Sequence, residues 1–266
     1  MEKITSLQNI KIKNAVKLHK ASERKAQNLI IVEGSREISQ AIKNGFKGQH
    51  LFICNDIISK EFKRNIEIEK YFDYKYEISP EVFEKISYRE GTEGYVAIFK
   101  PKFKSLEEIK LKENPLIIVL ESVEKPGNLG AILRTAEAAD IDLLISCDPL
   151  TDFYNPNVIR ASLGCVFKVP VAACSSELAI NWLKKNKIIT YAASLNAKKI
   201  YTQFDYTGPT AFVMGTEATG LSDKWISATD NEIIIPMLGS HDSLNVATAA
   251  AILIYECLRQ RNFYLH

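Results

Sequence analysis

The sequence predicts an α/β protein in which a small α/β domain precedes a larger domain built on a mostly parallel sheet with helices on both faces. Two observations support this fold class. Short apolar runs alternate with helix-like segments along the chain, and this alternation is typical of α/β folds. In the second half the runs are apolar almost throughout, as expected for parallel strands that are buried on both faces.

The first domain is expected over residues 1–105. Helices are expected at residues 7–26 and 35–44, where the sequence is basic and helix-like. Strands are expected at the apolar runs LIIVEG, HLFICN and GYVAIF. The alternation of these elements predicts a small α/β domain.

The boundary between the domains is expected in KPKFKSLEEIKLKENP, residues 100–115. This stretch has two prolines, charges of both signs and few apolar positions that can pack in a core. We take residues 106–114 as the linker and residues 115–266 as the second domain.

The second domain is expected to alternate strands with helices. The expected strands are LIIVLESV, DLLISC, the region of VFKVPVAAC, IITYAAS, TAFVMG and EIIIPM, and the expected helices are residues 128–139, 156–164, 177–186 and 244–260. Ligands of such sheets bind in loops beyond the carboxyl ends of the strands. The candidate loops are ESVEKPGN, MGTEATG and PMLGSHDS, each of which follows a strong strand.

The composition excludes several classes of protein. With 46% hydrophobic and 25% charged residues, the chain is an ordinary globular protein, not a disordered or fibrous one. No apolar run reaches the roughly eighteen residues of a membrane span. The N-terminus, MEKITSLQNIKIKN, lacks the apolar core of a secretory signal. We therefore expect a cytoplasmic protein without a membrane segment.

The cysteines and histidines show no metal-binding pattern. The five cysteines form no C-x-x-C pair and lie mostly in apolar segments, as small buried hydrophobic residues do in a reducing compartment. The four histidines lack the spacing of metal ligands on a helix. We expect neither disulfides nor a metal site.

The net charge of +2 hides an asymmetry between the two halves. Residues 1–110 hold 21 basic and 16 acidic residues, whereas residues 111–266 hold 13 and 16. The basic excess begins near the N-terminus, where Lys13, Arg24 and Lys25 are candidates for RNA contact, because such a module favours a polyanionic partner. Taken alone, the basic excess is equally consistent with a helix face that is simply exposed to solvent.

The first candidate loop leads into PGNLGAILRT. Its proline and glycines turn the chain out of the strand, and Asn128 is placed to cap the helix that follows. Arg134 lies six residues further on, about one and two-thirds turns of helix. Its fork of donors suits phosphate or ribose oxygens. The alternative is a surface arginine on an ordinary helix.

The second candidate loop is GTEATGLS, residues 215–222. Its glycines have the spacing of a phosphate-binding loop, but Leu221 stands where that motif requires lysine, which argues against an NTPase. The sequence also lacks a G-x-G-x-x-G fingerprint there. Gly215 lets a ligand lie against the main chain, and Glu217 can accept hydrogen bonds from it. A purely structural glycine turn is the alternative.

The third candidate loop runs from Ile235 to Ser243 and Asn245. The segment ATAAAILIYECLR follows as a helix that is apolar almost all the way round, so it must be buried on several sides, against its own sheet and a second subunit. Capping alone explains Ser243. Capping does not explain why two polar side chains precede an alanine-rich turn. That pattern suits close packing of the backbone around a ligand.

Three segments, NLGAILRTA, MGTEATGLS and IPMLGSHDSLNVATAAAILIYE, resemble the three ordered motifs of the SpoU/TrmH family of RNA 2'-O-ribose methyltransferases, a branch of the SPOUT superfamily. VIRASLG resembles an intermediate element of that family. The stretch SLQNIKIKNAVKLHKASERKAQNLIIVEGSREI resembles the small ribosomal-protein-like RNA-binding domain that is often fused in front. The resemblance to the motifs spans the whole second domain.

The resemblance implies a trefoil knot in the second domain, S-adenosylmethionine as methyl donor and a homodimer that shares the site. The cofactor is expected against the main chain of Gly215, Ile235 and Leu244, with Met237 in the same pocket.

The resemblance also assigns catalytic roles to Asn128, Arg134, Glu217, Ser243 and Asn245. A guanidinium stays protonated in proteins and is a poor base, so Arg134 is expected to orient a phosphate of the substrate and to stabilise the developing alkoxide. Asn128 is expected to position Arg134, while Ser243 and Asn245 hold the ribose or the loop.

Further candidates for RNA contact lie outside these motifs. Arg160 is expected near the exposed start of a helix, where a structural salt bridge is the alternative. Tyr88 and Tyr95 are able to stack on bases, but their setting beside GYVAIF favours core packing.

Ribosomal RNA is the expected substrate, because the N-terminal domain resembles that of ribosomal relatives. Transfer RNA is the alternative. A non-catalytic RNA-binding assembly factor with the same fold is a different class of function, and the presence of all five candidate catalytic side chains argues against it. An enzyme that methylates a base nitrogen is a third possibility, against which the SLNV segment favours the ribose.

Overall fold

The computed structural model describes residues 1–58, 66–88, 93–216, 219–240 and 243–263. It divides into two compact units. The first unit comprises Met1–Lys102 and Asp152–Lys168, and the second comprises Phe103–Thr151 and Val169–His266. Both are α/β folds, which confirms the predicted fold class.

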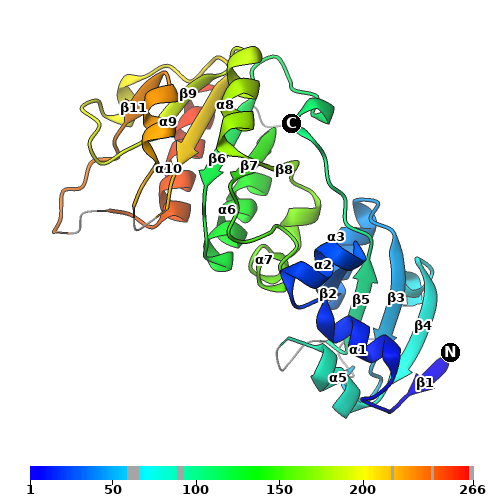
Figure 1. Cartoon of the computed structure of the whole chain (residues 1–266). Helices are drawn as coiled ribbons and strands as arrows, with labels where there is room; N and C mark the ends of the chain where they lie inside the picture. The colour runs from blue at the N-terminus through cyan, green and yellow to red at the C-terminus, as the bar shows by residue number, and fades with distance from the viewer. Residues whose placement is uncertain (59–65, 89–92, 217–218, 241–242, 264–266) are drawn as a thin grey trace. The chain divides into compact units, whose positions relative to one another are not determined.

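A five-stranded sheet in the order β1-β4-β3-β5-β2 forms the centre of the first unit (Figure 1). β1, β4 and β3 are parallel, whereas β5 is antiparallel to both β3 and β2. The strands are β1 (Glu2–Ile4), β2 (Ile30–Glu33), β3 (Gly48–Ile53), β4 (Phe72–Ile78) and β5 (Tyr95–Phe99). β1 and β4 add to the three predicted strands; β1 is short, and charged residues interrupt the aromatic residues of β4.

The helices of the first unit are α1 (Ile10–Lys17), α2 (Ala21–Gln27), α3 (Ser35–Lys43), α4 (Ile66–Glu69), α5 (Pro80–Ile86) and α7 (Pro156–Ala161). α1 and α2 replace the single helix predicted over residues 7–26. The break falls at Lys20, whose backbone is extended. Arg24 stabilises the break, because its guanidinium donates to the carbonyl oxygens of Leu18 and His19 at 2.8 and 2.9 Å.

Apolar side chains of α1, α5 and the sheet form a core of the first unit. Ile12 and Ala15 of α1 join Phe52 and Tyr76 of the sheet and Phe83 of α5. This core fixes the position of β2 and of the chain that follows it, because Ile31 of β2 belongs to the same cluster.

Residues 152–168 complete the first unit, although they lie between two strands of the second unit in the sequence. Asp152 forms an ion pair with Arg24, and the hydroxyl of Tyr154 donates to the carbonyl oxygen of Lys102. Phe167 packs edge-on against Phe46, with ring centroids 4.9 Å apart. No pattern in the sequence indicates that this segment leaves the second unit.

A six-stranded sheet in the order β11-β9-β10-β6-β7-β8 forms the second unit. Every pair of neighbouring strands is parallel, which confirms the prediction. The strands are β6 (Leu116–Glu121), β7 (Leu143–Cys147), β8 (Val171–Cys174), β9 (Ile189–Ala193), β10 (Thr210–Met214) and β11 (Asn231–Ile233). β8 is shorter than predicted, because Cys165–Phe167 form a 3-10 helix instead.

Helices cover both faces of this sheet. On one face α8 and α9 pack on a core that includes Val119, Ile145 and Val213. Side chains alternate along a strand, so the buried Ile118 and Phe212 face the other side, where α10 contacts β6, β10 and α6. The helices are α6 (Pro126–Ala138), α8 (Ser176–Lys185), α9 (Asp223–Ala228) and α10 (Val246–Gln260).

Two further properties concern the described residues. None of their helices has both the length and the apolar character needed to cross a bilayer. Their His, Cys, Asp and Glu side chains form no group of three or more that could hold a metal ion.

Candidate active site

A pocket of about 670 Å³ lies in the second unit. Its walls come from the segments that follow β9, β10 and β11 and from the start of α10. These segments are distant in the sequence, but the carboxyl ends of parallel strands lie at one edge of the sheet, where ligands of such folds bind. The volume is within the range of about 300–1,000 Å³ that is usual for small-molecule sites.

The four residues predicted to bind the cofactor all line this pocket: Gly215, Ile235, Met237 and Leu244. Ser243, predicted as a catalytic residue, lines it as well. The pocket therefore joins the second and third candidate loops in one site.

Gly215 opens a tight hairpin at the end of β10. The main chains of Thr216 and Gly220 bond in both directions, at 3.2 and 3.0 Å. A Cβ atom on Gly215 would lie 2.0 Å from the carbonyl oxygen of Gly220, so a side chain at this position would force the hairpin open. Gly220 has a φ of +67°, a conformation that favours glycine. Glu217, predicted as a catalytic residue, lies outside the described residues.

Glu121 anchors the far end of the same loop. Its carboxylate accepts hydrogen bonds from the main-chain N–H of Ser222 at 2.8 Å and from the Ser222 hydroxyl at 2.6 Å. Glu121 is buried at the end of β6. The site prediction omitted this residue, although a carboxylate that ends a run as apolar as LIIVL is a detectable signal.

Asn245 links the first and third candidate loops. Its side-chain N–H donates to the side-chain oxygen of Asn128 at 3.1 Å, and its own side-chain oxygen accepts from Ala247 N at 2.9 Å. Asn245 is thus the N-cap of α10, whereas capping was attributed to Ser243. The predicted cap role of Asn128 is wrong as well, because α6 begins earlier, with Pro126 in its first turn and Lys125 at the N-cap.

Arg134 is exposed on α6, two turns beyond the start of the helix. Asn128 and Arg134 share this helix, and Asn128 contacts Asn245 directly. The structure therefore brings residues of all three candidate loops to the same end of the second unit.

The candidate RNA-contact residues all lie in the first unit. Lys13 and Lys25 are exposed on α1 and α2. Arg24 is only 5% exposed, and its guanidinium binds main-chain oxygens and Asp152, so we leave it out of the proposed RNA contacts. Arg160 is exposed on α7.

Two family models match the chain. The SpoU rRNA Methylase family matches residues 115–255, and the MRM3-like substrate binding domain matches residues 9–97. The 23S rRNA (guanosine(2553)-2'-O)-methyltransferase RlmP of Bacillus subtilis is 27% identical over 256 residues, which are 96% of this chain and 98% of the relative. A tRNA (guanosine(18)-2'-O)-methyltransferase of Thermus thermophilus is 35% identical over 160 residues, or 59% of this chain and 81% of the relative.

Solved structures match over the whole chain. An AdoMet-bound rRNA methyltransferase from Sinorhizobium meliloti has a TM-score of 0.90 and 27% identity, covering 100% of this chain and 99% of its own. An RNA 2'-O ribose methyltransferase has a TM-score of 0.85 and 33% identity, covering 98% and 99%. The methylase match alone takes in more than half of the residues, and the chain therefore belongs to the SpoU rRNA methylase family, with an MRM3-like substrate-binding domain before its methylase domain.

Proposed function

We propose that this protein is an RNA 2'-O-methyltransferase that transfers the methyl group of S-adenosylmethionine to a ribose 2'-hydroxyl. One observation carries the proposal beyond family membership. The hairpin after β10 and the start of α10 form one pocket, and Asn245 at that start bonds to Asn128 of the remaining loop. Cofactor-binding and candidate catalytic groups are therefore neighbours.

The pocket residues fit S-adenosylmethionine. Gly215 and Gly220 line the pocket through their main chains, which approach so closely that a Cβ atom on Gly215 would collide with Gly220, and Ile235, Met237 and Leu244 offer apolar surface. An adenine ring has apolar faces and a polar edge. Apolar side chains suit the faces, and main-chain donors and acceptors suit the edge. When bound, the cofactor supplies an electrophilic methyl group on a sulfonium centre.

We assign the other steps to side chains of this chain. Arg134 orients a phosphate of the substrate, which accepts the proton of the ribose 2'-hydroxyl, and stabilises the negative charge that develops on the ribose oxygen, because a fixed guanidinium fork suits phosphate and alkoxide oxygens. Asn128 positions Arg134, and Ser243 and Asn245 hold the ribose or the loop. Glu217 completes the proposed catalytic set. Alignment of this kind lowers a barrier by roughly 7–11 kcal/mol.

Arg134→Ala tests this assignment. We expect methyl transfer from labelled S-adenosylmethionine to RNA to fall by about 10²–10³-fold, with cofactor affinity unchanged in equilibrium binding. Lys184→Ala, on the exposed side of α8, is the matched control and retains full activity. Normal transfer by Arg134→Ala would refute the role of Arg134. A wild-type protein that binds the cofactor but methylates no RNA would instead support the assembly factor.

Ribosomal RNA is the proposed substrate, and tRNA the alternative. Two relatives named as 23S rRNA methyltransferases align with 96% and 87% of this chain, whereas a tRNA (guanosine(18)) enzyme and the 23S rRNA methyltransferase RlmB of Coxiella burnetii each align with only 59%. The alignments that include the substrate-binding part are thus those with the first two rRNA enzymes. A ribose-methylation map of total RNA with and without the gene identifies the nucleotide, and a mark missing only from tRNA would overturn this choice.

We further propose that residues 1–105 bind RNA through contacts that include Lys13 and Lys25, and that Arg160 contributes from the segment 152–168, which belongs to the same unit. Residues 106–114 link residues 1–105 to a methyltransferase domain that takes the rest of residues 115–266. A cytoplasmic location fits a ribosomal substrate.

We also propose a trefoil knot and a homodimer. The dimer is supported by α10, which keeps Tyr255 44% exposed on a helix that is otherwise largely apolar. Light scattering should give twice the chain mass of 30.0 kDa; the single mass would refute the dimer.

A further inference from the structure

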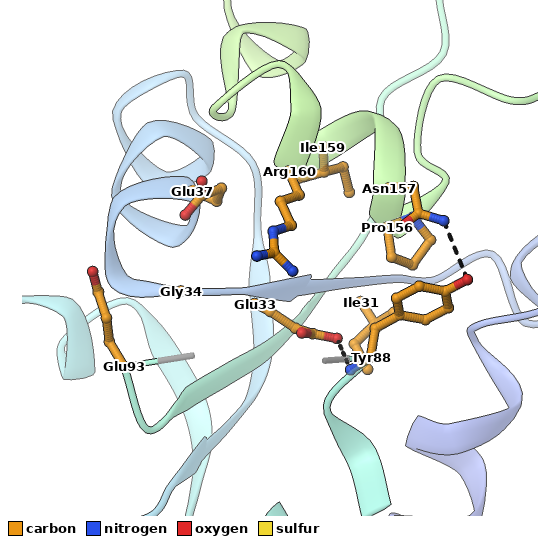
Figure 2. A pocket seen from close by; sticks show the side chains of 10 residues that line it. All are labelled: Ile31, Glu33, Gly34, Glu37, Tyr88, Glu93, Pro156, Asn157, Ile159 and Arg160. Carbon is orange, nitrogen blue, oxygen red and sulfur yellow. Dashed lines mark hydrogen bonds between the residues drawn. The ribbon is translucent and has the colours of Figure 1, made fainter. Parts of the chain in front are cut away.

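The first unit contains a second pocket, of about 210 Å³, that the proposed reaction does not use (Figure 2). Three separate parts of the chain line it: β2 with the start of α3, α7, and the residues Tyr88 and Glu93. Its volume is below the range of about 300–1,000 Å³ for drug-sized ligands. The pocket is therefore of a size to hold one small planar group.

Three carboxyl groups line this pocket, those of Glu33, Glu37 and Glu93. Glu33 accepts a hydrogen bond from the main-chain N–H of Tyr88 through one oxygen, at 2.6 Å. Its other oxygen has no hydrogen-bond donor among the described residues. Glu37 lies across the pocket (Figure 2), while Glu93 is engaged by the main chain and hydroxyl of Ser35. Glu33 and Glu37 thus retain acceptors for a ligand.

Burial affects the charge of both carboxyl groups. It raises the pKa of Glu33 to about 7, against the opposing effects of the Tyr88 N–H and of Arg160. It also raises the pKa of Glu37, which nearby Glu93 raises further. Near neutral pH Glu33 therefore exists in both its protonated and its ionised form, and a ligand that donates hydrogen bonds to it selects the ionised form.

Arg160 supplies the opposite kind of group. Its side chain extends from α7 toward the space between Glu33 and Glu37 (Figure 2), and its charge lowers the pKa of both. Nevertheless, its guanidinium makes no hydrogen bond or ion pair with any residue that the structure describes. A structural salt bridge, the alternative raised by the sequence, is therefore not formed, and a fork of donors remains available beside two acceptors.

Tyr88 supplies an aromatic wall. It is 48% exposed, so the predicted core packing is wrong for Tyr88, while Tyr95 is buried. The side chain of Asn157 donates to the Tyr88 hydroxyl at 3.2 Å, and the ring of His19 lies 5.5 Å from the Tyr88 ring. These contacts hold the ring in place at the edge of the pocket.

We propose that this pocket binds an unstacked guanine base of the RNA substrate. The proposal rests on the proposed RNA-methyltransferase function and adds a base-recognition site to it. Guanine presents N1–H and N2–H donors side by side, and the Glu33 oxygen that is not bonded to Tyr88 is able to accept from both. Its O6 and N7 acceptors match the fork of Arg160, and its ring is able to stack on Tyr88. Adenine and uracil lack both of these adjacent pairs, and cytosine lacks the pair of donors.

The test uses the full chain and labelled RNA pentamers, UUGUU, UUAUU, UUCUU and UUUUU, with fluorescence anisotropy as the readout. We expect UUGUU to bind about tenfold more tightly than the other three, within the discrimination of one bidentate pair. Equal affinity for all four pentamers would overturn the proposal. Tighter binding of UUCUU than of UUGUU would overturn the choice of base.

Three variants separate base recognition from general attraction to RNA. Arg160→Lys keeps the charge but removes the fork, and Glu33→Gln replaces one carboxylate oxygen with a donor; each should abolish the preference for UUGUU and leave UUUUU affinity unchanged. Lys13→Ala, on an exposed part of α1, should weaken all four pentamers equally and preserve the preference. A preference that survives both pocket variants would overturn the proposal. Circular dichroism and melting verify that each variant folds.

Two further arms identify the source of the guanine and separate this proposal from the proposed function. Free guanosine should displace UUGUU from the wild type but not from Arg160→Lys. Tighter binding of GMP than of UUGUU would indicate a nucleotide site and overturn the RNA source.

Arg134→Ala should retain the pentamer preference. If the wild type shows the preference but methylates no RNA, only the proposed function fails, whereas methylation without the preference refutes only the pocket.

Discussion

The side chain of Asn245 donates to the side chain of Asn128 across 3.1 Å, joining two residues that are 117 positions apart. Asn245 at the same time caps α10 through Ala247. One amide side chain thus fixes the start of a buried helix and the position of the residue proposed to orient Arg134.

Substitutions of this pair should separate stability from catalysis. Asn245→Ala loses the cap and should lower the free energy of unfolding by about 1 kcal/mol. Asn245→Ser keeps a capping oxygen but loses the amide donor, so it should remain stable and still slow methyl transfer. Combined with Asn128→Ala in a double-mutant cycle, Asn245→Ser should show a coupling of about 0.5–3 kcal/mol in the transition-state free energy. Additive effects on kcat would contradict this.

Glu121→Ala should weaken the attachment of the proposed cofactor-binding loop at its Ser222 end. The main-chain N–H and the hydroxyl of Ser222 lose their acceptor; because Ser222 is exposed, water takes the place of the carboxylate, and each lost hydrogen bond costs about 0.5–1.5 kcal/mol. We expect a higher KM for S-adenosylmethionine with a smaller change in kcat. Ser222→Ala removes only the hydroxyl and serves as the milder comparison. An unchanged KM in Glu121→Ala would show that the anchor does not control the loop.

Gly215→Ala should disrupt the cofactor pocket directly. The new Cβ atom would meet the backbone of Gly220 at 2.0 Å, and backbone cannot move aside as a flexible side chain does. Overpacking of this kind costs about 1–3 kcal/mol, which we expect as weaker cofactor binding in calorimetry. Gly208→Ala is the control, because a Cβ atom there meets nothing within 4 Å. Equal affinities in the two variants would argue against the tight hairpin.

Glu33→Gln should change the pH dependence of stability. Burial raises the pKa of Glu33 from 4.5 to about 7 in the folded protein, so between these values the folded state holds the proton and the unfolded state releases it. The stabilising contribution is present below pH 4.5 and is lost as the pH rises to about 7; its size is at most about 3 kcal/mol.

The free energy of unfolding of the full chain in urea, measured at pH 5 and pH 8, checks this prediction. Wild type should lose more stability over that interval than Glu33→Gln, whose amide does not titrate. Glu84→Gln, at an exposed position of α5, should behave like the wild type. The same pH dependence in wild type and Glu33→Gln would refute the prediction.

Much of the second unit could be predicted because its strands are buried on both faces. Runs such as that of β6 are apolar at almost every position, and parallel strands with helices on both faces follow from this pattern. The same reasoning located the three loops at the strand ends. It could not reveal which side chain accepts which hydrogen bond, so the cap was attributed to Ser243 and not to Asn245.

The first unit was harder to predict because its important features depend on contacts between distant residues. Charge alone made Arg24 a surface candidate, yet Asp152, 128 residues away, helps to hold it in a buried position. β4 mixes charged and aromatic residues, so its apolar signal is weak. Arg160 and Glu33 line one pocket although they lie far apart in the sequence, and no local pattern indicates this proximity.

The closure of the first unit by residues 152–168 has a consequence for synthesis of the chain. N-terminal domains usually fold first as they leave the ribosome. Here the last contacts of the N-terminal unit must wait until Asp152 and Phe167 have been synthesised, because these residues provide a partner for Arg24 and a packing surface for Phe46. Such late contacts require closure of a long loop and slow folding. The nascent N-terminal half therefore remains incomplete, and exposed to other folding factors, while β6, α6 and β7 are being made.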